Sequence, residues 1–279
     1  MSQKIAAAKK AIKIRKVDQY EDFEKLVEIQ KAVWKHEDAE LTPVHQFRIS
    51  SAMGGILLGA YVSRDLAGFV FSFPAVFRKK LGQHSHHLAV LPAYQGLGLG
   101  KRLKWAQREQ ALKMDYDRIT WTMDPLQTRN ANLNFHSLGA RSGTYLPHFY
   151  GPTPSLTVVP NLPTDRLLVE WPLRHKNVAA RRRDRFKIYE VNKIPKALER
   201  KSTVGGSFPC RPKLSLAGKT LLVEVPQSRK SWAARTALIS AWQTALRRAL
   251  RHYFNRGYAV TDFLFGDRCF YVLEKTNKA

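Results

Sequence analysis

The sequence predicts an α/β (α+β) fold, in which a sheet flanked by helices is followed by a small C-terminal α/β extension. Three observations predict it. Apolar strand patterns alternate with helical patterns along the first 175 residues. Residues 86–103 pass from an apolar strand through a glycine-spaced turn into a helix. After Leu173 the chain becomes polar and basic, and then a shorter set of strands and one long helix follow.

The elements before the glycine-spaced turn are a strand, a helix, a hairpin and a further strand. Residues 12–17 are typical of a first strand, and residues 19–35 of an amphipathic helix. Two apolar runs, 56–62 and 66–77, flank a short turn as in a β-hairpin, and residues 84–90 supply the fourth strand. The expected apolar face of the helix consists of Phe23, Leu26, Val27, Gln30 and Val33.

The glycine-spaced turn is suited to hold a pyrophosphate. Glycines let backbone N–H groups approach a phosphate closely, and the N-terminus of the next helix adds free N–H groups and a positive dipole end. Lys101, Arg102 and Lys104 oppose this dipole in the first turn, which makes sense if an anion is bound there. A dinucleotide-binding loop is disfavoured because Asp115 and Asp117 lie in a turn instead of at a strand end. A Walker loop would end in Gly-Lys-Ser/Thr, which is absent.

The alternation of strand and helix continues after this turn. Residues 118–123 are typical of a short buried strand, which Asp124 and Pro125 end. Residues 130–138 are typical of a helix closed by Gly139.

The C-terminal part is predicted to be a small α/β unit, either a subdomain of its own or an addition to the first sheet. Residues 219–225 form its first strand, and residues 233–255 a long helix capped by Gly257. Residues 258–265 and 269–274 form a closing hairpin. The expected apolar face of the helix holds Leu238, Trp242, Leu246, Leu250 and Tyr253, and the polar face Gln243, Arg247, Arg251 and Asn255.

Residues 90–100 resemble the acyl-CoA loop of the GNAT superfamily of N-acetyltransferases. That loop reads Gln/Arg-x-x-Gly-x-Gly/Ala after a Val-x-Pro strand end, and the matching positions are Val90, Pro92, Gln95, Gly98 and Gly100. Residues 121–140 and 165–173 are similar to a subgroup of predicted GNAT proteins with unidentified acceptors. The similarity covers residues 12–175.

The resemblance implies a GNAT-like mixed, mostly antiparallel sheet whose fourth and fifth strands separate to admit the donor. The domains are then residues 1–175, which bind acyl-CoA, and the basic extension 176–279. We expect one site for acetyl-CoA, or another acyl-CoA, as co-substrate, and direct transfer of the acyl group to an amine. The residues implied in donor binding are Leu88, Val90, Leu91, Gln95, Gly96, Leu97, Gly98, Leu99, Gly100, Lys101, Arg102 and Asn130.

Candidate bases lie on and after the fourth strand. His86 matches the position where many family members carry a glutamate, and an imidazole with a pKa near 6.5 suits a base at neutral pH. A structural histidine is the alternative. Strand alternation places His84 and His86 on one face and His87 on the other, and with no carboxylate near we expect no metal site. Asp124 is the next candidate base, or else a turn cap.

The general acid departs from the family pattern. The family usually carries a tyrosine four residues before the glycine that closes the helix, and Phe135 occupies that position here. Tyr145, Tyr150 or a water could protonate the departing thiolate instead. Without an acid, the fold could merely bind acyl-CoA.

The charge of the chain is strongly positive and uneven. The formal net charge is +25, and residues 176–279 hold 23 of the 47 basic side chains but only seven of the 22 acidic ones. The densest basic run, residues 181–185, is expected to be an exposed linker or a helix start. Either this is a solvated basic face, or it makes weak contact with RNA, DNA or the ribosome. No known nucleic-acid motif supports the second interpretation.

Cysteine usage and hydropathy favour a cytoplasmic protein that does not enter a membrane. Cys210 and Cys269 lack metal-binding spacing and are expected to be free thiols. No apolar run approaches the roughly 18 residues of a membrane span. The basic residues 1–16 lack the apolar centre of a secretion signal.

Three functional hypotheses remain open. The first is a GNAT acyltransferase that acts on an unidentified amine. The second is a non-catalytic acyl-CoA-binding module, which Phe135 favours. The third is a protein that binds RNA or another polyanion through its basic C-terminal part.

Overall fold

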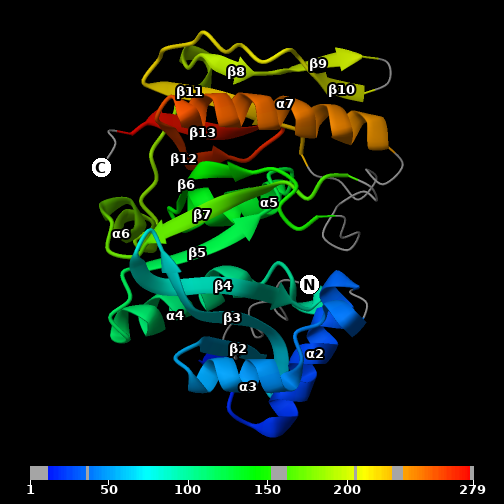
Figure 1. The fold of residues 1–279 in the computed structure, drawn as a ribbon, viewed down its shortest axis with the longest axis vertical. Helices are drawn as coiled ribbons and strands as arrows, with labels where there is room; N and C mark the ends of the chain where they lie inside the picture. The colour runs from blue at the N-terminus through cyan, green and yellow to red at the C-terminus, as the bar shows by residue number, and fades with distance from the viewer. Residues whose placement is uncertain (1–11, 36–37, 152–161, 204–205, 228–234, 277–279) are drawn as a thin grey trace. The chain divides into compact units, whose positions relative to one another are not determined.

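The protein is described by a computed structural model for residues 12–35, 38–151, 162–203, 206–227 and 235–276 (Figure 1). Contacts divide the chain into two compact units, which we call the first and the second unit. The first comprises Met1–Trp121 with Pro172–Arg174, and the second comprises Thr122–Trp171 with His175–Ala279. This division falls elsewhere than the predicted domain boundary after residue 175, which follows the extent of the sequence resemblance and stays a prediction.

The first unit is built on a sheet in the order β1-β2-β3-β4-β5. Its neighbours pair antiparallel except for β4 and β5, which pair parallel. The predicted strands and helices are confirmed within a few residues, but a second helix before the hairpin was not predicted. The strands are β1 (Ile12–Lys16), β2 (Ile56–Val62), β3 (Asp65–Phe77), β4 (Lys80–Val90) and β5 (Arg118–Met123), and the helices are α2 (Tyr20–Trp34), η1 (Asp38–Glu40), α3 (Val44–Ala52), η2 (Pro92–Tyr94) and α4 (Leu99–Lys113).

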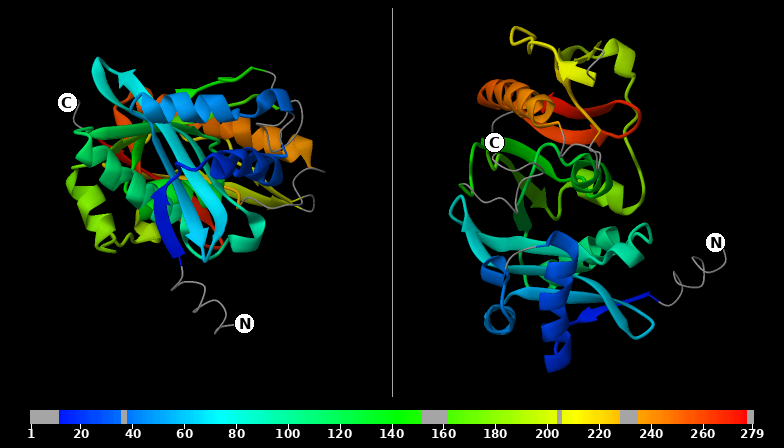
Figure 2. Two further views of the ribbon diagram at one scale, coloured as in Figure 1. Left: turned by 90° about the horizontal axis from the view of Figure 1, so that it is seen from below. Right: turned by 90° about the vertical axis from the view of Figure 1, so that its right-hand side faces the viewer.

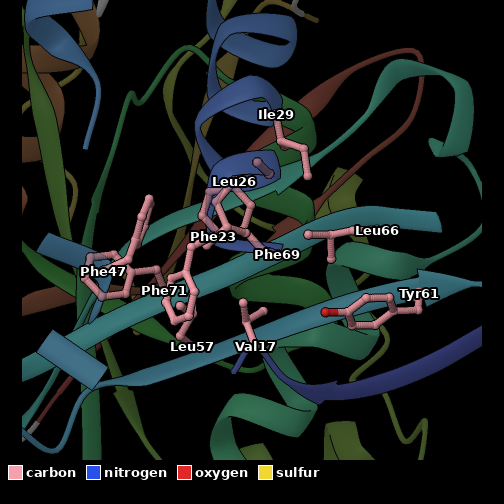
Figure 3. Close-up of a cluster of buried hydrophobic side chains, with 11 residues drawn as sticks. Val17, Phe23, Leu26, Ile29, Phe47, Leu57, Tyr61, Leu66, Phe69 and Phe71 are labelled. Atoms are coloured by element: carbon pink, nitrogen blue, oxygen red, sulfur yellow. The ribbon is translucent and has the colours of Figure 1, made fainter. Parts of the chain in front are cut away.

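The helices α2 and α3 cover one face of this sheet and enclose its main core (Figure 3). Phe47 of α3 is fully buried and packs edge-on against Phe69 and Phe71 of β3, with ring centroids 5.8 and 5.0 Å apart. Phe23 and Leu26 of α2 complete this layer. Truncating a buried phenylalanine of this kind to alanine costs about 3–5 kcal/mol, so the layer is a main support of β3 and β4.

The second unit is built on a sheet in the order β7-β6-β12-β13-β11-β8. Only β8 runs parallel to its neighbour, β11. The C-terminal strands join strand β6 of the predicted GNAT-like part, where Val260 pairs with Ser142. The C-terminal strands therefore extend the sheet that holds β6 and β7. The strands of the unit are β6 (Arg141–Leu146), β7 (Arg166–Pro172), β8 (Lys196–Leu198), β11 (Thr220–Val225), β12 (Tyr258–Leu264) and β13 (Cys269–Lys275), with a separate pair β9 (Arg200–Thr203) and β10 (Gly206–Pro209).

The helices of the second unit are α5 (Thr128–Ala131), the π-helical turn η3 (Asn132–Ser137), α6 (Lys176–Arg182), the 3-10 turn η5 (Val191–Lys193) and α7 (Thr236–Asn255). Helix α7 packs against β6, β12 and β11, on one face of this sheet (Figure 1 and Figure 2). The predicted start of α7 at residues 233 and 234 lies outside the described residues. Gly139 and Gly257 end their helices with φ of 70° and 82°, as predicted.

Two polar residues expected on the surface of this unit are buried. Gln243 was assigned to the polar face of α7, but its side-chain amide donates to the carbonyl of Pro163 at 2.6 Å. Residues 181–185 were expected to be an exposed linker or a helix start, but Arg181 lies at the end of α6, and its guanidinium donates to the fully buried Asp262 at 2.5 Å. Both errors have one cause, because the acceptors lie about 80 residues away in sequence and helical periodicity cannot reveal them.

Two further predictions concern thiols and membranes. Cys210 and Cys269 are both free, as predicted, and burial raises the pKa of the Cys269 thiol. Among the helices of the described ranges, none is long and apolar enough to cross a membrane.

Candidate functional site

Strand β4 has an open backbone edge along its second half. Its Ala89 and His87 lie opposite Phe69 and Phe71 of β3, and the N–H of Leu91 donates to the carbonyl of Ala67 at 2.9 Å. In an antiparallel ladder, alternate residues turn their backbone groups to the same neighbour. The intervening residues, which are Leu88 and Val90, therefore turn theirs away from β3.

The side that Leu88 and Val90 face is the side of β5. In the described part of the chain, β4 and β5 pair only at Gln83–Ile119 and His84–Thr120. The two strands therefore separate after His84, as the resemblance implies. Of the three strand positions predicted to bind the donor, Leu88 and Val90 have backbone groups on this edge, whereas the N–H of Leu91 is already used within the sheet.

A bulge interrupts β4 at His86. Phe71 lies opposite His87 and Ser72 lies opposite Ser85, so His86 is the extra residue on β4. The bulge breaks the alternation that was predicted to place His84 and His86 together on one face and His87 on the other. All three histidine rings lie instead beside the phenylalanines of β3.

The three histidines have different surroundings. His86 keeps an exposed side chain, 4.3 Å from the ring of His87, yet the surrounding protein removes enough water to lower its pKa below 6.5. His87 packs against the core aromatics, with its ring centroid 4.9 Å from that of Trp34. His84 contacts the Thr120 hydroxyl at 3.2 Å, and burial, with the positive charges nearby, lowers its pKa to about 4. His86 is therefore the exposed and neutral imidazole of the group at pH 7.

The loop after β4 has the geometry that a pyrophosphate requires. The Gln95 side chain donates to the carbonyl of Val90 at 3.2 Å, which holds the loop against the strand end. Gly96 and Gly98 have φ of 82° and 78°, and a Cβ at either position would meet nothing within 4 Å. Gly98 is the N-cap of α4, so the N–H groups of the first turn, from Leu99 onward, emerge beside this open space.

The cations at the start of α4 differ from the prediction, which placed all three around an anion. The Arg102 guanidinium donates to the carbonyl of Ile12 at 3.1 Å and so ties the helix to β1. Lys104 turns into the protein and is only 2% exposed. Its ammonium donates to Ser85 Oγ at 3.0 Å and to Gln107 Oε1 at 2.6 Å. Lys101 is half-buried.

Sequence reasoning missed this buried cluster of Lys104, Ser85 and Gln107. A lysine in an amphipathic helix is usually read as exposed. The available signal was its position beside Leu103, on the face of α4 that also holds Leu99 and Gln107.

The remaining candidate residues lie in the second unit. Asp124 accepts the N–H of Leu126 at 2.8 Å, which is the geometry of a turn cap, and burial raises its pKa. Asn130 is exposed on α5. Phe135, in the position of the usual tyrosine, is fully buried against Tyr271, whose hydroxyl donates to the carbonyl of Pro125.

The two candidate tyrosine acids have unlike surroundings. The Tyr145 hydroxyl is buried and donates to Asp165 at 2.6 Å, while Arg247 binds the same carboxylate at 2.8 Å. Burial, and then the Asp165 charge, raises the pKa of Tyr145 well above 10. Tyr150 is exposed, and its hydroxyl contacts that of Thr122 at the end of β5, 2.8 Å away. Tyr150 thus has the more accessible proton.

The sequence matches one protein-family model, that of the acetyltransferase (GNAT) family, over residues 20–140. The matched residues include β4, the glycine-spaced loop and α4. A search of curated proteins found no significant match.

Solved structures of acetyltransferases are similar to part of this chain. One is yncA from Salmonella typhimurium, solved with acetyl-CoA, which is 18% identical, with a TM-score of 0.47 over 60% of this chain and 96% of that one. Another is the ribosomal-protein-S18-alanine N-acetyltransferase from Escherichia coli, which is 17% identical, with a TM-score of 0.46 over 59% of this chain and 95% of that one.

Proposed function

Because residues 20–140 match the model of the acetyltransferase (GNAT) family, we propose that this chain moves an acetyl or other short acyl group from acyl-CoA to an amine by direct transfer. The amine nitrogen bonds to the acyl carbon, and CoA leaves as a thiol. The reaction requires a polarised donor carbonyl, a neutral amine and a proton for the sulfur. One observation carries the proposal: the open edge of β4 continues through the glycine-spaced loop into the N-terminus of α4.

Two parts of the donor would bind to two parts of the site. The pyrophosphate would lie against the backbone N–H groups of residues 96–101, where the positive φ of Gly96 and Gly98 keeps side chains out of the way. The pantetheine arm would extend along the edge of β4 and exchange hydrogen bonds with the backbone of Leu88 and Val90. The positions are supported by the strand register and by the separation of β4 from β5.

The base that we propose is His86, which would take the amine proton directly or through a water. Its exposed ring and lowered pKa support this role, because a base must be unprotonated at working pH. Asp124 is the weaker alternative, since its carboxylate already caps a turn. Of the two tyrosines, Tyr150 is the better candidate acid, because the Tyr145 hydroxyl donates to Asp165.

A second function is favoured by one observation. Phe135 fills the position of the family's tyrosine acid and is fully buried. A chain without an acid could bind acyl-CoA and transfer nothing. Turnover separates the two functions. We expect release of free thiol from acetyl-CoA when the protein is screened with a panel of amines, whereas tight CoA binding without thiol release from any amine would support the binding module.

Donor binding is tested by Gly98→Val, which adds a side chain where the phosphate must approach. We expect calorimetry to show a steep loss of CoA affinity in a folded variant. Gly257→Val is the matched control, because Gly257 has nearly the same φ, 82°, but caps α7 in the second unit. It should lose stability and keep its CoA affinity. Unchanged CoA affinity in Gly98→Val would remove the loop from the site.

A further inference from the structure

Lys104 is a buried lysine, and its charged form is costly in free energy at such a place. It is 2% exposed, and taking a charge out of water costs several kcal/mol before contacts offset it. Its contacts include Ser85 Oγ at 3.0 Å, Gln107 Oε1 at 2.6 Å and the face of the Trp121 ring, whose centroid is 3.9 Å away. A leucine or methionine could fill the same space without the free-energy cost of burying an amine. The presence of a lysine here therefore suggests a role for its amine.

The ammonium lies where β4 and β5 begin to separate. Ser85 and Trp121 directly follow His84 and Thr120, the last residues that pair the two strands in the described chain. Ser85 also directly precedes the bulge at His86. Lys104 thus contacts both strands at the origin of their separation, and the proposed base is one residue from its hydrogen-bond partner.

The proposed donor path ends at this point. From Val90, beside the pyrophosphate loop, back to Ser85 the strand spans five residues, or about 16 Å at 3.3 Å per residue. An extended pantetheine arm has a similar length. A donor anchored at the loop and stretched along the edge of β4 would therefore bring its sulfur close to Ser85.

The hydrogen bonds leave the Ser85 proton available. Ser85 Oγ accepts from Lys104 Nζ and from Gln107 Nε2, at 3.0 and 3.2 Å. Its own O–H donates to Gln107 Oε1 over a weak 3.3 Å, and that oxygen already accepts from Lys104 at 2.6 Å. Burial lowers the pKa of Lys104 well below 10.5, which makes its ammonium a better proton donor.

We propose that Lys104 and Ser85 together return a proton to the CoA sulfur when the acyl group leaves, an assignment that rests on the proposed acyl transfer. The bond between the acyl carbon and sulfur breaks, and its electron pair stays on sulfur. The sulfur takes the Ser85 hydroxyl proton, while Ser85 Oγ takes one from the Lys104 ammonium. The products are CoA thiol, an unchanged serine and a neutral lysine, which regains its proton from solvent.

The test uses Lys104→Met, an apolar side chain of similar length, with two measurements. The kcat with acetyl-CoA should fall about 100-fold or more, as is typical when a general acid is lost, while KM for acetyl-CoA changes little. The second measurement is the dependence of kcat on pH. The kcat of the wild type should decline as pH rises through the lowered pKa of Lys104, because the ammonium loses the proton that it supplies, and the variant should lack this decline.

Lys113→Met is the control, because Lys113 is an exposed lysine at the end of the same helix, and both measurements should stay unchanged. If wild-type CoA does not bind, the proposed function fails. If CoA binds and folded Lys104→Met keeps its kcat and the decline of kcat at high pH, only the proton donor is overturned. If Lys104→Met does not fold, Ser85→Ala decides by the same two measurements. A loss of rate in Tyr150→Phe but not in Ser85→Ala would also overturn the assignment.

Discussion

At the scale of single residues, the three histidines of β4 lie on the same side of the strand but differ in exposure. Among the three histidines of β4, His86 is the one that combines an exposed side chain with a lowered pKa. A base works while it is unprotonated, so activity should be lost as pH falls through that lowered pKa. We expect kcat/KM of the wild type to hold down to pH 6.5 and to decline below it.

His86→Ala should lower kcat/KM about 100-fold or more on the plateau, as is typical when a general base is lost, and CoA affinity should stay nearly the same. The pH–rate profile checks this. His87→Phe is the control, because His87 lies among the core aromatics and a ring of similar size preserves their packing. A wild-type profile in His86→Ala would return His86 to a structural role.

Substitutions of Tyr145 and Tyr150 should differ in their effect on the stability of the protein. Tyr145→Phe removes a hydrogen bond to the buried Asp165 and should lower the free energy of unfolding by about 1–3 kcal/mol, with kcat unchanged. Tyr150→Phe alters an exposed hydroxyl and should leave stability nearly the same. Urea denaturation measures the free energy of unfolding of both variants, and initial rates measure their kcat. A drop in kcat for Tyr145→Phe without a loss of stability would contradict the assignment of that hydroxyl to structure.

At the scale of elements, the sequence predicted the strands and long helices well because their apolar periods are local. The loop from Gln95 to Gly100 was also predictable, because closely spaced glycines favour a turn with positive φ. The bulge at His86 was not, because it depends on how β3 pairs with β4. Lys104 was missed for a similar reason, since Ser85 holds it from 19 residues away.

Helix α6 contains a second buried cation whose partner is distant in the sequence, Arg181, and its contribution to stability can be measured. Asp262 of β12 is fully buried and binds Arg181 and, at 3.0 Å, the Nδ1 of His136. Arg181→Met leaves that carboxylate without its main cation, and it should cost about 3–5 kcal/mol in free energy of unfolding. Arg183→Met, which changes an exposed neighbour, should cost almost nothing. Urea denaturation checks both, and equal effects of the two variants would show that the buried pair contributes no stability.

At the scale of the whole molecule, the C-terminal extension is part of the sheet that holds β6 and β7. A fragment of residues 1–175 would lose β12 from the edge of β6, Tyr271 from Phe135 and Arg247 from the buried Asp165. We expect this fragment to aggregate or to lack a cooperative unfolding transition. Calorimetry of the purified fragment tests this, and a sharp transition would establish residues 1–175 as an independent domain.

The basic surface of the extension is tested by salt. If a polyanion binds, counterions are released, so log affinity should fall linearly with log salt. We expect weak RNA binding that disappears near physiological salt, and a shallower slope when Arg182, Arg183 and Arg185 are neutralised. Arg181 must be left intact, because it is buried against Asp262. A salt-resistant, sequence-selective complex would instead support a nucleic-acid partner.

The pairing of β6 with β12 can form only late in the synthesis of these residues. Ser142 leaves the ribosome 118 residues before its partner Val260, and Phe135 leaves 136 residues before Tyr271. Most of the first unit is complete by Trp121, apart from the return of residues 172–174. The middle of the nascent chain must therefore wait with an unpaired strand edge and an uncovered aromatic until β12 and β13 have been synthesised, which makes this interval the one in which a chaperone is needed most.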